Sequence, residues 1–247
     1  MIKKFFVTLL ATAAFFTSCK SDDDNNELST EQQDSLDDQA IEEYLEQHYF
    51  SQDNGKITKF DTIAGNEDDK NNPSLKSLAK KDPAGFYYAY RPGVTADGPS
   101  IVSNDDSKIL ISYDVKTFEA TNDTDIYKYK YGTISNYANT INTGDGSATT
   151  DPSFYYYQLT SEQIKNGIKR EHIELKYFAE ALKKFKSTGR SGRELYNFQG
   201  VIILPSRLAY GRNKMYTGSS VTANHAYRNA SFIFNFELDK VTPRTTE

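Results

Sequence analysis

The sequence has no tryptophan, a single cysteine, two methionines and three histidines in 247 residues. His48, His172 and His225 lie far apart, and no two of them have the spacing of a metal-binding pair. One cysteine can form neither an internal disulfide nor a cysteine-based metal site. A P-loop, a dinucleotide-binding glycine pattern and a nucleophile elbow are also absent. We therefore expect neither a metal nor a cofactor.

Positive charge is scarce as well. The chain has 29 lysines and arginines against 34 aspartates and glutamates, which gives a net charge of −5. A nucleic-acid partner would require a basic stripe, so we expect none. What the chain does have is 18 tyrosines and 15 phenylalanines. Because aromatic side chains bury large areas, they predict a well-packed core in spite of the polar overall composition.

Long hydrophobic runs are limited to the segment from Phe5 to Phe16, which is shorter than the about 20 residues needed to cross a bilayer. This run follows Lys3 and Lys4 and ends at Phe16-Thr17-Ser18-Cys19, the pattern of a secretory signal. Small residues before a cysteine resemble a lipobox, although Phe16 is bulkier than the usual leucine. An ordinary signal peptide that contains a cysteine is the alternative. Acylation would remove an otherwise unpaired thiol, so we predict a signal peptide over 1–18 and a lipid anchor at Cys19.

An acidic segment with almost no apolar residue follows, and we interpret 19–37 as a solvated tether. It resembles the acidic leaders of lipoproteins that some Gram-negative bacteria send to the cell surface. A plain spacer explains it equally well. The predicted location is the cell envelope, at the outer membrane, on either the periplasmic face or the cell surface.

Hydrophobic periodicity divides the rest of the chain into an extension over 38–83 and a domain from residue 84. The extension begins with an amphipathic helix over 38–50 and continues with a strand over 55–62 and a loop. A capping box at Thr160–Gln163 predicts a helical turn, and 171–187 has the clearest helical stripe. Alternating residues predict strands over 85–93, 108–120, 125–132, 153–159, 197–206 and 229–241. The fold class is α+β, with an antiparallel sheet of five to six strands over one main helix.

Two motifs stand out near the carboxy-terminal end. They are Leu208-Ala209-Tyr210-Gly211 and the later Asn229-Ala230 with Phe234 and Glu237-Leu238. Together they resemble the carboxy-terminal half of FKBP-type peptidyl-prolyl isomerases. The helix over 178–185 and the strand over 109–113 are similar to the corresponding family elements. The resemblance covers 84–242, leaves 243–247 as a tail, and extends to the exported lipoprotein members associated with gliding motility.

The resemblance implies an isomerase that acts on proline-containing exported polypeptides. Such an enzyme needs no nucleophile, metal or cofactor, because the barrier is amide resonance of about 18–20 kcal/mol. An aromatic pocket lowers it by twisting the Xaa-Pro bond and removing its carbonyl from water. The residues assigned to that pocket by the resemblance are Tyr113 and Phe234 as walls, Phe178 as the floor, Tyr210 as a hydroxyl donor, Tyr155 or Tyr157 as a further wall, Tyr127 on the third strand, and the N–H near Leu175 as a donor to the ligand.

Two departures from the family pattern leave alternatives open. The family aspartate on the third strand is replaced by Tyr127, or Asp125 stands two residues away. The family segment before the helix is replaced by 174–178 or by 163–168. Core packing also explains Tyr113 and Phe234. The alternatives to an isomerase are a non-catalytic binding module for extended or proline-containing segments and a structural accessory of a surface complex. The oligomeric state is not predictable from the sequence.

Overall fold

The computed structural model describes residues 28–62, 68–123, 128–131, 133–141, 147–191 and 195–245. Cys19 and Tyr127 lie outside these residues. Over the described ranges, none of the helices is both long enough and apolar enough to pass through a bilayer.

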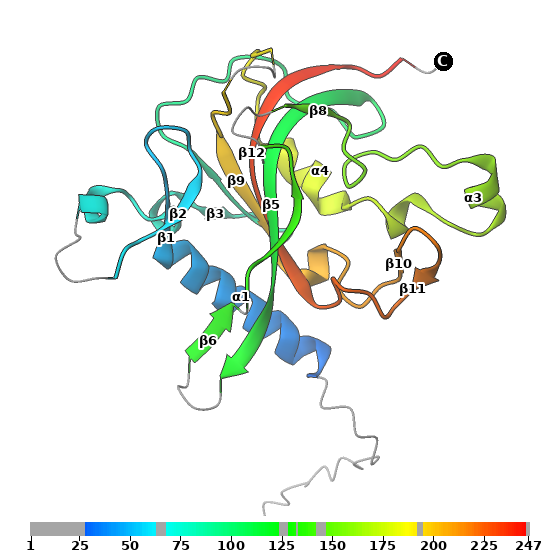
Figure 1. Cartoon of the computed structure of the whole chain (residues 1–247), viewed down its shortest axis with the longest axis horizontal. Coiled ribbons are helices and arrows are strands. Elements are labelled where there is room, and N and C mark those ends of the chain that lie inside the picture. The colour runs from blue at the N-terminus through cyan, green and yellow to red at the C-terminus, as the bar shows by residue number, and fades with distance from the viewer. Residues whose placement is uncertain are drawn as a thin grey trace, which may run out of the picture.

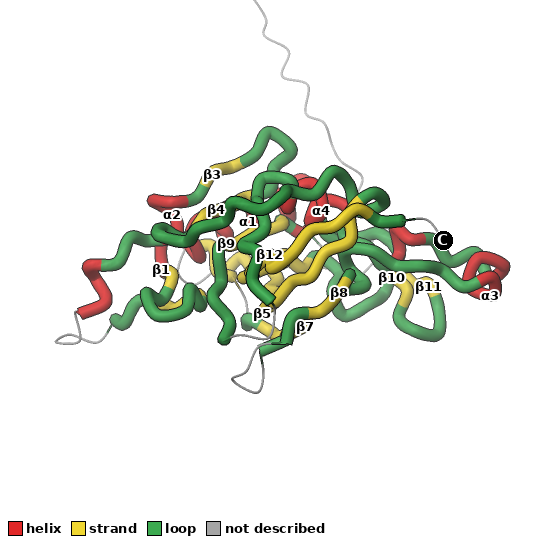
Figure 2. The backbone as a smooth tube through the Cα atoms, turned by 90° about the horizontal axis from the view of Figure 1, so that it is seen from above, coloured by secondary structure: helices red, strands yellow, loops and turns green. Residues whose placement is uncertain are grey.

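Two long antiparallel strands form the centre of the molecule. β5 (Ser107–Asp123) pairs with β12 (Ala230–Pro243) from Ala230 opposite Glu119 to Pro243 opposite Ser107. Figures 1 and 2 show them side by side through the middle of the fold. Both had been predicted from their alternating residues, which place apolar side chains on one face at every second position.

Shorter strands extend this sheet on both sides. Beyond β12 lie β9 (Gly200–Leu204), β4 (Tyr87–Tyr90) and β3 (Lys80–Lys81), in that order. The far side of β5 pairs in turn with β8 (Thr149–Thr150), β7 (Ser135–Asn139) and β6 (Lys128–Tyr131). Every one of these pairings is antiparallel. The predicted large antiparallel sheet is therefore confirmed, and it has more strands than the five to six expected.

The sheet is buried on both faces. On one face α4 (Lys176–Leu182) packs on inward residues of β5, β9 and β12 that include Tyr113, Ile202 and Phe234. On the other face α1 (Thr30–Gln47) and α2 (Leu75–Leu78) cover the alternate positions of the same strands, such as Ile203 and Ile233. Burial on both faces explains why all five residues of β9 are buried.

The helix α1 corrects the boundary of the predicted tether. It begins at Thr30 rather than at residue 38, because Ser29 and Gln32 form a capping box. Its first turns also make specific contacts: the buried Asp37 carboxylate accepts hydrogen bonds from Gln33 Nε2 at 2.9 Å and from the Ser206 N–H at 2.8 Å. Residues 30–37 are thus part of the folded domain. The helix ends at Gln47, and β1 (His48–Phe50) then pairs with β2 (Ile57–Lys59).

Other predicted elements change in length or type. The helix expected over 171–187 is a 3-10 turn, Arg170–His172, followed by the shorter α4. The capping box at Thr160 is confirmed and opens α3 (Ser161–Lys165). The segment 153–159 is not a strand. The structure also has a small hairpin that had not been predicted. It consists of β10 (Met215–Tyr216) and β11 (Val221–Thr222) and follows the 3-10 turn Ser206–Leu208. A further 3-10 turn covers Asp68–Asn71.

Candidate functional site

Four aromatic rings meet between α4 and the sheet, and we call them the inner cluster: Tyr113, Phe154, Phe178 and Phe234. Phe178 and Phe234 have ring centroids 4.4 Å apart and no exposed surface. Tyr113 lies on the same face of the sheet because paired residues of β5 and β12 point to the same side, and Tyr113 is opposite Phe236, two residues from Phe234. The structure therefore brings together three of the aromatic residues that the resemblance assigns to the pocket.

Phe154 fills the space between these rings, and the sequence did not predict it. Its ring centroid lies 5.2 Å from Tyr113, 5.2 Å from Phe178 and 5.5 Å from Phe234. Phe154 is 2 % exposed. The pocket that the resemblance describes is thus occupied by a side chain of the protein itself.

The two hydrogen-bond donors assigned to the ligand are also engaged within the protein. The Leu175 N–H donates to the Phe154 carbonyl at 2.8 Å. The Tyr210 hydroxyl, 3 % exposed, donates to the Ile173 carbonyl at 2.6 Å. Burial strongly raises the pKa of this hydroxyl, so it stays protonated and keeps its donor role. In this arrangement neither donor is available to a ligand at the inner cluster.

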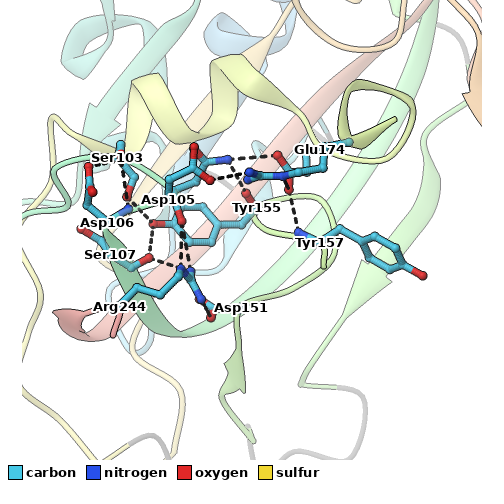
Figure 3. A network of polar contacts seen from close by, with 11 residues as sticks. Ser103, Asp105, Asp106, Ser107, Asp151, Tyr155, Tyr157, Glu174 and Arg244 are labelled. Atoms are coloured by element: carbon cyan, nitrogen blue, oxygen red, sulfur yellow. Dashed lines mark hydrogen bonds and ion pairs between the residues drawn. The ribbon is translucent and has the colours of Figure 1, made fainter. Parts of the chain in front are cut away.

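The segment that carries Phe154 is fixed by a polar network around Tyr155 (Figure 3). The buried Tyr155 hydroxyl donates to the Ser107 carbonyl at 2.9 Å, and its pKa is raised by burial. Asn104 Nδ2 donates to the Tyr155 carbonyl at 3.1 Å, while the Tyr157 N–H donates to Glu174 Oε1 at 2.6 Å. Tyr155 is therefore a core residue and not a wall of an open pocket.

Two arginines also contact the segment that carries Phe154. The guanidinium groups of Arg244 and Arg170 lie 3.6 Å and 4.7 Å from the centroid of the Tyr156 ring. Arg244 also forms an ion pair with Asp151 at 2.6 Å, at the start of the segment. With contacts at almost every residue from Asp151 to Tyr157, the inner cluster is a packed part of the core.

Outside Phe154 the structure has an open aromatic cleft, which we call the outer cleft. It has a volume of about 710 Å³. Its walls include Tyr113 and Phe154 from the inner cluster together with residues from β7, the β10–β11 hairpin and the following loop: Tyr137, Met215, Tyr216, His225 and Tyr227.

Tyr137 and Tyr227 at its rim are in contact with each other and only partly buried. The Tyr137 ring lies 4.9 Å from the Tyr227 ring and 4.9 Å from the Phe232 ring, both edge to face. The Tyr137 and Tyr210 hydroxyls are 3.3 Å apart. Sequence reasoning missed Tyr137, because it lies on β7, which no alternation pattern had indicated.

The strand that borders the site is β7, not the segment 125–132. β7 pairs with β5 beside Tyr113, with Val115 opposite Ala138, whereas β6 pairs near the far end of β5. The residues of β7 are Ser-Asn-Tyr-Ala-Asn, with no carboxylate. Tyr127 and Asp125 lie outside the described residues. The carboxylate that does line the outer cleft, Asp151, is paired with Arg244 and accepts the Ile109 N–H at 2.9 Å.

Histidine at the outer cleft has a structural role. His225 Nδ1 accepts the Tyr227 N–H at 3.2 Å, which leaves Nε2, 3.0 Å from the Asn213 carbonyl, as the donor. Among the described residues no group of three or more His, Cys, Asp or Glu side chains could hold a metal ion. What the outer cleft offers a ligand is therefore aromatic surface, hydroxyl groups and partial exclusion of water.

Comparisons with known proteins give little further guidance. No family model matches the chain, and no curated protein matches it. Among solved structures, the crystal structure of FkpA from Escherichia coli matches with a TM-score of 0.33 and 18% identity, over 67% of this chain and 52% of that chain. The chain thus spans about half the length of that protein. A likeness this distant carries no conclusion about family or activity.

Proposed function

We propose that this chain is an FKBP-like domain that binds proline-containing segments of exported polypeptides in the outer cleft and accelerates rotation about their Xaa-Pro bonds. The observation that carries the proposal is the set of half-buried aromatic rings around a cleft of about 710 Å³. A prolyl ring is apolar and rigid, and it packs well against aromatic faces. Rings of this kind also shield the Xaa-Pro carbonyl from water.

Partial desolvation is enough for the proposed chemistry. The planar amide is more polar than the twisted one, so a poorly solvated cleft favours the twisted form. The substrate needs no covalent partner, and the only group in motion is its own peptide bond. Uncatalysed isomerisation takes tens to hundreds of seconds, so a modest acceleration would suffice.

A second candidate is a binding module without isomerase activity. The donors at Leu175 and Tyr210 already bond to the Phe154 and Ile173 carbonyls, and β7 provides no carboxylate. A site that grips the prolyl ring but offers no donor to the rotating amide would bind without accelerating rotation.

The two candidates differ in one measurement on the full chain. Magnetisation exchange between the cis and trans forms of an Xaa-Pro peptide gives the rotation rate, and chemical-shift titration gives binding. We expect both faster exchange and binding, each reduced in Tyr227→Ala. The matched control is Tyr196→Ala, which removes a half-buried tyrosine that packs against Phe198 outside the cleft. Binding without faster exchange would exclude the isomerase and support the binding module. The absence of both binding and faster exchange would exclude both candidates.

We also propose that the domain is held at the outer membrane through acylated Cys19, close to where exported polypeptides emerge. Two or more acyl chains anchor a protein stably, whereas one chain anchors it weakly. Metabolic labelling with a palmitate analogue tests this, and Cys19→Ser should abolish the label and release the protein from the membrane fraction.

A further inference from the structure

A polar groove lies next to the outer cleft. It lies between α3 and the β10–β11 hairpin and has a volume of about 670 Å³. Tyr216 lines both the cleft and the groove, so the two cavities share a wall. Figures 1 and 2 show α3 and the hairpin side by side at the same end of the molecule, away from the central sheet.

The groove differs from the cleft in chemistry. Most of its lining side chains are uncharged and polar. Thr160 and Gln163 form the capping box of α3, and Gln163 Nε2 also donates to the Tyr157 hydroxyl at 3.0 Å. Asn166, Ser219 and Ser220 are the other uncharged polar residues that line the groove. Glu162 is the charged residue among those that line it. An extended polypeptide presents one backbone N–H and one carbonyl at each residue, and it needs partners of both kinds. The Asn166 side-chain amide and the Ser219 and Ser220 hydroxyls provide such partners without selecting a particular side chain.

We infer that this groove binds the residues that flank the proline in the substrate polypeptide, and that Glu162 favours a basic side chain among them. This inference rests on the proposed function, because the prolyl ring in the outer cleft is what aligns the chain with the groove. The occupant is one continuous extended segment that passes Tyr216 from the aromatic to the polar part of the site.

The length of the ligand tests the groove separately from the cleft. A short peptide that contains only the Xaa-Pro core is compared with a longer one that adds polar flanking residues. We expect the longer peptide to bind the full chain about tenfold tighter. Ser219→Trp should fill the groove and abolish this gain while leaving short-peptide binding unchanged. The control is Ser35→Trp, at an exposed position of α1.

The charge of the flanking residues provides a second test. Glu162→Lys should weaken the binding of a long peptide with flanking lysines and strengthen the binding of one with flanking glutamates. The control is Glu119→Lys, which changes an exposed charge on β5 and should alter neither affinity. Equal binding of short and long peptides, or a gain that survives Ser219→Trp, would overturn the inference while the outer cleft stands. If the short peptide itself does not bind, the proposed function and this inference fail together.

Discussion

The inner cluster and the outer cleft are built from the same kinds of side chain, yet they differ in packing. In the inner cluster every ring contacts another ring, and the nearby donors at Leu175 and Tyr210 have partners within the protein. In the outer cleft the rings of Tyr137, Tyr216 and Tyr227 are only half-buried around an open volume. Aromatic residues can therefore form a binding surface only where packing leaves part of each ring exposed. Residue type alone does not separate the two cases.

Removal of a ring from each region should give the clearest contrast in stability. Phe178→Ala should lower the free energy of unfolding by about 3–5 kcal/mol, because it leaves a cavity among fully buried rings. Tyr227→Ala, at the half-buried rim, should cost about 1 kcal/mol. Urea unfolding followed by circular dichroism measures both. Similar losses in the two variants would mean that the rim is also a packed core.

Phe154→Ala should turn the inner cluster into a second cleft. The stability loss should be about 3 kcal/mol, and the vacated space is bordered by Tyr113, Phe178 and Phe234. We expect a proline-containing peptide to bind this variant about tenfold tighter than the parent. Phe118→Ala is the matched control, since Phe118 is equally buried but on the α1 face of the sheet. A gain in both variants would trace the effect to general loosening.

Asp239 extends the comparison to a buried charge. It is 2 % exposed and accepts a hydrogen bond from Ser112 Oγ at 3.1 Å; burial and the nearby Glu237 raise its pKa to about 7. Since the folded state holds this proton more tightly than the unfolded state, Asp239 should stabilise the fold below pH 4 and lose that contribution as the pH rises through 7.

The difference in unfolding free energy between Asp239→Asn and the parent isolates this group from other titrations. It should grow in favour of the variant between about pH 4 and pH 7, by a few kcal/mol, and then level off. His48, whose pKa burial lowers to about 4, acts in the opposite sense in the parent and the variant alike, and so cancels from the difference. A difference that does not vary with pH would show that Asp239 titrates normally.

Tyr210→Phe should cost less stability than the loss of a buried ring. The variant loses the hydrogen bond to the Ile173 carbonyl, and we expect a stability loss of about 1–2 kcal/mol. Because the hydroxyl already donates to a carbonyl within the protein, peptide binding at the outer cleft should be unchanged. A large loss of binding would place Tyr210 at the ligand after all. The Tyr210 hydroxyl donates in the interior, whereas Tyr137 lies at the rim of the outer cleft. Peptide binding to Tyr137→Phe is therefore the complementary measurement, because this variant removes a hydroxyl at the rim.

Periodicity predicted the parts of the fold in which one rule dominates. The strands around Tyr113 and Phe234 have an apolar residue at every second position because α4 covers that face. The Thr160 capping box is a local signal that needs no tertiary contact. The start of α1 was also readable, from Ser29 and Gln32, but the acidic composition of this stretch obscured it.

The part of the site that was not predictable depends on long-range contacts. The segment 153–159 alternates like a strand, yet Asn104, Arg170, Glu174 and Arg244 hold it in an irregular path. No pattern within those seven residues shows that Phe154 turns inward. The role of Tyr137 depends in the same way on the pairing of β7 with β5. Resemblance located the aromatic residues but could not say which of them are packed.

The position of β12 has a consequence for the order of folding during synthesis. β12 follows every other strand of the sheet along the chain, yet it lies between β9 and β5 at the sheet's centre. Until it has been made, β5 and β9 have no common neighbour and the two hydrophobic faces cannot close. Pairing of strands so distant in sequence is slow. The domain should therefore remain unfolded while most of it is being synthesised, and should fold in one late step once this strand has left the ribosome.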